Sequence, residues 1–153
     1  MRFSVSLVAL ALAIPGLANF HIGKADKQTN PFNKDDPVIK WTDYVACPSN
    51  YFGCKCYGGF KATADRGVST TRNKAPSGDS FSLNAGLCGM GKLDFYWRPN
   101  LRKWEFFESN GDGKVKGECY PNSTHDLCFL RTGTALTVNY YDSLVCYSYI
   151  CGE

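Results

Sequence analysis

The residues with the most distinctive chemistry in this chain are its eight cysteines, whose thiols can form disulfides or bind a metal. In an exported chain an even number of cysteines predicts disulfides, and their pairing stays open because eight cysteines can combine in about 105 ways. Zinc is the competing interpretation, since Cys119, His125 and Cys128 lie close together in sequence. However, no Cys-x-x-Cys pair occurs, and an oxidising compartment works against free thiolates. We therefore expect four disulfides and no zinc among Cys47, Cys54, Cys56, Cys88, Cys119, Cys128, Cys146 and Cys151.

A second metal chemistry depends on where the chain is cut. Cleavage after Ala18 makes Asn19 the first residue and His21 the third residue of the mature chain. An α-amine, two backbone amides and a histidine in third place form a square-planar nitrogen site that suits Cu(II) or Ni(II). The competing interpretation, which we favour, is an arm that happens to begin with this sequence.

Asn122 begins an Asn-Ser-Thr tripeptide, which is an acceptor sequence for N-glycosylation. It follows Tyr120 and Pro121 in a turn-like setting, and such segments are commonly exposed. We predict that Asn122 is a glycosylation site.

Acid–base catalysis on a nucleic acid would combine a histidine, a carboxylate and an arginine. On paper His125 could join Glu105 or Glu118 and Arg98 or Arg131 in such a set. Yet His125 is the only histidine after Cys47, and no hydrolase motif such as Gly-x-Ser-x-Gly occurs. We expect no enzyme activity and keep a small secreted nuclease as an alternative.

The first residues have the pattern of a secretion signal. Arg2 supplies a positive start, an apolar run covers Phe3–Ile14, and small residues precede the cut at Ala18. This run is shorter than the roughly 20 residues that a membrane span needs. We therefore expect residues 1–18 to be a cleaved signal peptide and the product to be secreted, with no transmembrane segment.

The remaining chain divides into two parts by composition. Residues 19–44 are polar and contain no cysteine, which predicts a flexible N-terminal arm. Residues 45–153 hold every cysteine and form the predicted cysteine-rich β domain. The formal net charge of +3 is too balanced for a nucleic-acid partner, which needs a basic cluster. We expect a monomer that requires no cofactor.

Alternating apolar residues recur along the second half of the chain. The pattern is clear at Leu93, Phe95 and Trp97, and again from Leu136 to Tyr140. Between them, residues 110–113 read Asn-Gly-Asp-Gly, a strong hairpin signal because these residues accept positive φ. We predict a mainly β fold, a disulfide-rich antiparallel β-sandwich or barrel-like sheet, with a small α+β sandwich as the alternative.

Many of these alternating residues are aromatic, and exposed rings could form a sugar-binding face. The candidates are Phe95, Tyr96, Trp97, Trp104, Phe106, Phe107 and the C-terminal tyrosines. More often, alternating aromatics are core on one face of a sheet and cross-strand cover on the other. The partner is therefore either a host protein or a cell-surface glycan.

Signal, size and cysteine content together resemble the small secreted cysteine-rich proteins of plant-associated filamentous fungi, many of which are candidate effectors. The segment Leu136–Tyr140 ahead of Cys146 is also similar to the closing strand of fungal killer-toxin proteins with an α/β-sandwich fold. The first resemblance implies an extracellular protein that works in the host apoplast or inside host cells.

These observations lead to one functional expectation and two alternatives. We expect an effector-like protein that acts outside the producing cell in virulence, as a non-enzymatic binder of a host or cell-surface component. An antimicrobial or killer-toxin-like protein is the first alternative, and the nuclease is the second.

Overall fold

The computed structural model describes residues 19–30, 35–57, 69–72, 78–132 and 134–151. Its eight strands form one antiparallel sheet in the order β3-β2-β1-β8-β7-β6-β5-β4. The strands are β1 (Phe20–Asn30), β2 (Lys40–Pro48), β3 (Ser69–Arg72), β4 (Ser80–Leu83), β5 (Leu93–Arg98), β6 (Lys103–Glu108), β7 (Gly117–Thr132) and β8 (Thr134–Ser148). The helical pieces are η1 (Ser49–Tyr51), α1 (Cys54–Tyr57) and η3 (Leu87–Gly89).

The predicted mainly β, disulfide-rich fold is confirmed. Among the described residues the longest helix, α1, has only four residues, which does not support the α+β alternative. No helix in the described part of the chain is long and apolar enough to cross a membrane.

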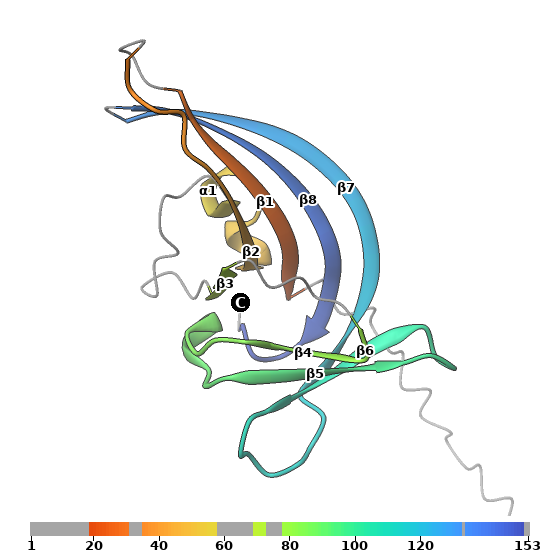
Figure 1. Cartoon of the computed structure of the whole chain (residues 1–153). Helices are drawn as coiled ribbons and strands as arrows, with labels where there is room; N and C mark the ends of the chain where they lie inside the picture. Colours follow the sequence, from red (N-terminus) through yellow and green to blue (C-terminus); the bar gives the residue numbers. More distant parts are fainter. Residues whose placement is uncertain (1–18, 31–34, 58–68, 73–77, 133, 152–153) are drawn as a thin grey trace, which may run out of the picture.

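The sheet is strongly curved (Figure 1), and its strand pairing is irregular in two places. The pairing of β1 with β8 shifts between Ile22 and Gly23, and the pairing of β7 with β8 shifts between Pro121 and Thr124. Both shifts lie beside Ser143 of β8, and bulges of this kind bend a strand and increase its twist. In Figure 1 β1, β8 and β7 curve side by side, with α1 on the inner side of the curve.

The prediction of a flexible arm over 19–44 is wrong. Phe20 and the following residues form β1, which pairs with β2 on one side and β8 on the other. Phe20, Ile22 and Ala25 are fully buried. The buried positions change from even to odd numbers after Ile22, because Phe20 and Ile22 pack in one buried cluster and Ala25 packs in another. No single alternation of apolar residues therefore runs through this strand. The predicted boundary at residue 45 also falls inside β2, whereas residues 1–18 lie outside the described residues.

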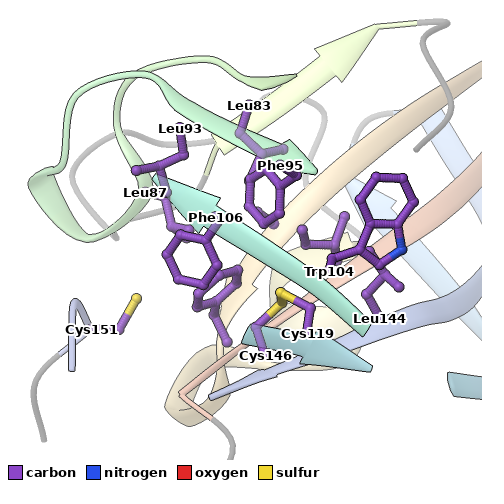
Figure 2. Close-up of a cluster of buried hydrophobic side chains, with 13 residues drawn as sticks. Leu83, Leu87, Leu93, Phe95, Trp104, Phe106, Cys119, Leu144, Cys146 and Cys151 are labelled. Carbon is purple, nitrogen blue, oxygen red and sulfur yellow. A yellow bond between two sulfur atoms is a disulfide. The ribbon is translucent and has the colours of Figure 1, made fainter. Parts of the chain in front are cut away.

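The alternating segments of the second half behave as predicted. Leu93 and Phe95 of β5, and Trp104 and Phe106 of β6, are buried. Figure 2 shows Phe95, Phe106 and Trp104 gathered near the disulfide between Cys119 and Cys146. On the inner side of β8, Leu136, Val138 and Tyr140 form a second buried cluster with residues of β1, β2 and α1. The predicted turn is also present, since Asn110 and Gly113 both have positive φ.

All eight cysteines are paired, as expected for an exported framework. The bridges are Cys47–Cys56, Cys54–Cys128, Cys88–Cys151 and Cys119–Cys146. One holds α1 to β7, one holds η3 to the C-terminal segment, and one joins directly opposite residues of β7 and β8. The zinc interpretation therefore fails, because both of its cysteines are bonded to other cysteines.

Candidate binding site on the outer face of the sheet

The face of β5–β8 that points away from the core carries a cross-strand row of four residues. Tyr96 lies opposite Glu105, Glu105 opposite Glu118, and Glu118 opposite Tyr147. We call this set the outer row. Its two tyrosines lie at the ends, on β5 and β8, and its two glutamates lie side by side in the middle.

Two facing glutamates repel each other unless cations compensate them. Lys103 Nζ pairs with Glu118 and lies 3.8 Å from Glu105 Oε1. Arg98 Nε lies 2.7 Å from Glu105 Oε2. Tyr120 donates its hydroxyl to Glu118 Oε1 at 2.8 Å. The hydrogen bonds from Lys103 and Tyr120 hold the pKa of Glu118 below its ordinary value.

Each tyrosine of the outer row packs against a second aromatic ring. Tyr96 and Phe107 have ring centroids 5.8 Å apart at an interplanar angle of 69°. Tyr120 and Tyr147 are 5.9 Å apart at 71°. These edge-to-face contacts hold the rings in place, and Tyr96, Tyr120 and Tyr147 remain exposed. The outer face thus carries a fixed aromatic pair at each end of a group of ion-paired side chains. This group, which we call the charge ladder, consists of Arg98, Lys103, Glu105 and Glu118.

An open pocket of about 420 Å³ lies beside the first aromatic pair. Its lining includes the Tyr96 and Phe107 rings together with the polar side chains of Asp94, Glu108 and Asn110. Burial raises the pKa of Asp94, but hydrogen bonds from its serine neighbours and the charge of a nearby lysine outweigh burial, so the pKa lies below its ordinary value. Asp94 is therefore a fixed, ionised acceptor at the edge of the pocket.

A second pocket, of about 400 Å³, lies beside the other aromatic pair. Tyr147 and Tyr149 line it together with Lys116, Glu118 and Ser148. The side chain of Tyr149 is 99% exposed, so its ring is available to a partner on both faces.

The predicted nuclease set is brought together only in part. Arg98, Glu105 and Glu118 join the charge ladder, where each carboxylate already has a cationic partner. His125 stacks on Tyr141 at 4.6 Å, and no described contact brings it to either glutamate. The side chain of Arg131 lies outside the described residues.

The proposed copper or nickel site at Asn19 and His21 does not fit this structure. The backbone nitrogen of Asn19 donates to the Cys146 carbonyl at 2.8 Å. His21 belongs to β1, and its Nδ1 atom lies 2.9 Å from Asp142 Oδ2. A square-planar site would require these nitrogens to leave the sheet together. Among the described residues no group of three or more His, Cys, Asp or Glu side chains could hold a metal ion.

Asn122 lies where the pairing of β7 with β8 shifts, and its side-chain amide forms a hydrogen bond with a buried residue. Its Nδ2 atom donates to Asp142 Oδ2 at 2.6 Å. Asp142 is almost completely buried, and His21 contacts it from the opposite neighbouring strand. Glycosylation of Asn122 stays a prediction, and the glycan would be attached to the nitrogen that makes this contact.

The sequence alternation at Leu93, Phe95 and Trp97 already implied that Tyr96 points to the other face of its strand. It did not show which strands are neighbours, so the outer row was missed. No known protein family matches the chain, and no curated protein and no solved structure matches it.

Proposed function

We propose that this protein is secreted and acts outside the producing cell as a non-enzymatic, effector-like binder of a cell-surface glycan in virulence. The observation that carries the proposal is the outer row, with an exposed aromatic pair at each end. Sugar rings have apolar faces that pack on aromatic rings and hydroxyl edges that bond to polar side chains. Both kinds of group line the pockets at the two ends.

The spacing of the two aromatic pairs favours an extended glycan over a single sugar. Tyr96 on β5 and Tyr147 on β8 are separated by three strand intervals. At about 4.8 Å per interval this is roughly 14 Å, which exceeds the length of one sugar ring. An oligosaccharide chain laid across the strands would reach both pairs.

Binding is favoured over catalysis by the state of the charged groups between the pairs. Glu105 and Glu118 are compensated by Arg98 and Lys103 within the same face. A carboxylate in such a ladder is a poor general base, because its charge is already stabilised. The ladder instead supports a rigid, nearly neutral surface between two stacking positions.

The test is a pulldown of the purified mature protein on insoluble chitin, cellulose and plant cell-wall polymers. We expect retention on at least one polymer and a loss of affinity of about tenfold or more in a Tyr96→Ala/Tyr147→Ala variant. Tyr141→Ala is the matched control, since Tyr141 is an equally exposed tyrosine of β8 that lies outside the outer row. Retention that is equal in the double variant, or no retention on any polymer, would contradict the proposal.

A further inference from the structure

Two buried polar atoms, one of them on Asp142, have no hydrogen-bond partner in the part of the chain that the structure describes. Asp142 is 1% exposed, and its Oδ2 atom has Asn122 Nδ2 at 2.6 Å and His21 Nδ1 at 2.9 Å. Among the described residues its Oδ1 atom has no hydrogen-bond partner. The hydroxyl of Tyr57, a completely buried residue of α1, has no partner there either.

Both unpaired atoms lie at the same level of the sheet. Gly23 of β1 is the direct cross-strand partner of Asp142. A Cβ atom at Gly23 would lie 2.4 Å from Tyr57 Oη and 2.7 Å from the Tyr141 carbonyl oxygen. The Tyr57 hydroxyl therefore rests on the backbone at Gly23, beside Asp142. The pKa of Tyr57 is raised, mainly by burial and in part by the Asp142 charge, which agrees with this placement.

We propose that one ordered water molecule binds between Tyr57 Oη and Asp142 Oδ1. Tyr57 donates its hydroxyl hydrogen to the water, and the water donates to Asp142 Oδ1. The Tyr141 carbonyl oxygen supplies an acceptor for the second hydrogen of the water. Buried waters commonly make about three hydrogen bonds to groups that would otherwise be unsatisfied, and leaving two buried polar atoms unpaired costs free energy.

The water would complete a hydrogen-bonded chain from His21 through Asp142 to Tyr57. This chain joins β1, β8 and α1 at the level where both strand pairings shift. Its function is to fix the short α1 helix against the curved sheet by polar contacts, in addition to the disulfide Cys54–Cys128.

Tyr57→Phe tests the proposal through the sign of its effect on stability. If the hydroxyl donates to a bound water, its removal leaves the water with one partner fewer, and we expect Tm to fall by several degrees. If the hydroxyl is unpaired, its removal relieves a buried polar group, and Tm rises. Tyr140→Phe is the matched control, because its ring stacks on Tyr57 at 4.6 Å while its hydroxyl only approaches Asp126 at 3.5 Å. An unchanged or higher Tm for Tyr57→Phe overturns the proposal.

A high-resolution crystal structure of the wild-type protein would show directly which group accepts the hydrogen bond from the Tyr57 hydroxyl. The proposal expects a water oxygen about 2.6–3.2 Å from both Tyr57 Oη and Asp142 Oδ1. A direct hydrogen bond between these two side chains with no water between them would overturn it. This measurement decides the question even if the Tyr57→Phe variant does not fold.

Discussion

At the scale of single residues, glycine decides where elements can approach closely. A Cβ atom at Gly117 would lie 2.4 Å from the Tyr147 carbonyl oxygen and 2.8 Å from Phe106 Cε1. Neither the backbone of a neighbouring strand nor a fully buried ring can move away cheaply. Gly117 is therefore required at the start of β7, where this strand lies close to the backbone of β8 and to the buried ring of Phe106.

We predict that Gly117→Ala lowers the free energy of unfolding by about 1–3 kcal/mol, the usual cost of overpacking. The matched control is Gly91→Ala, whose new Cβ atom would meet only the flexible end of Glu108 at 3.1 Å. Urea unfolding of both variants measures the difference. Equal losses in the two variants would show that the close approach at Gly117 is relieved by movement of the strand.

At the scale of elements, β4, β5 and the turn after β6 are joined through Asp94. Ser82 Oγ donates to Asp94 Oδ1 at 2.5 Å, Ser109 donates to Oδ2, and Lys92 lies 3.5 Å from Oδ1. Burial opposes ionisation, but these contacts outweigh it and lower the pKa of Asp94. Because the folded pKa lies below the unfolded value of about 3.9, the carboxylate stabilises the fold above that value, and the stabilisation is lost as pH falls through the folded pKa.

Removing one donor should reduce this acid sensitivity. In Ser82→Ala the pKa of Asp94 moves back toward the unfolded value, so the variant should lose less stability than the wild type as the pH falls from about 5 to about 2. Urea unfolding across this range measures the two slopes. Ser80→Ala, an exposed serine of the same strand, is the control and should keep the wild-type slope. Parallel curves for Ser82→Ala and the wild type would contradict the role given to Asp94.

At the scale of the whole molecule, disulfides connect segments that are distant in sequence. Cys54–Cys128 closes a separation of 74 residues, whereas Cys47–Cys56 closes a separation of only 9. In the chain-entropy account, the longer loop restricts the unfolded chain more.

We predict that replacing Cys54 and Cys128 with serine destabilises the protein by about 2 kcal/mol more than the same replacement of Cys47 and Cys56. Urea unfolding of the two double variants under non-reducing conditions measures this difference. A larger loss for the Cys47 and Cys56 replacement would show that local packing, rather than loop closure, dominates the effect of these bridges.

Local patterns were sufficient for the class of fold. Alternation at Leu93 and Phe95, and from Leu136 to Tyr140, predicted strands correctly, because inward and outward directions in a strand repeat every two residues whatever the strand pairs with. The even number of cysteines predicted a complete disulfide framework for the same kind of reason, since it depends only on composition and compartment.

Long-range pairing decided the rest. His21 and Asp142 are 121 residues apart in sequence, yet they meet because β1 pairs with β8 in the middle of the sheet. The polar composition of residues 19–44 concealed that strand, and its buried residues are divided between two clusters, so no single apolar alternation marks it. The outer row and the disulfide partners likewise follow from strand order and register. Neither property is encoded in any single segment, because each depends on which distant strands bury their apolar faces together.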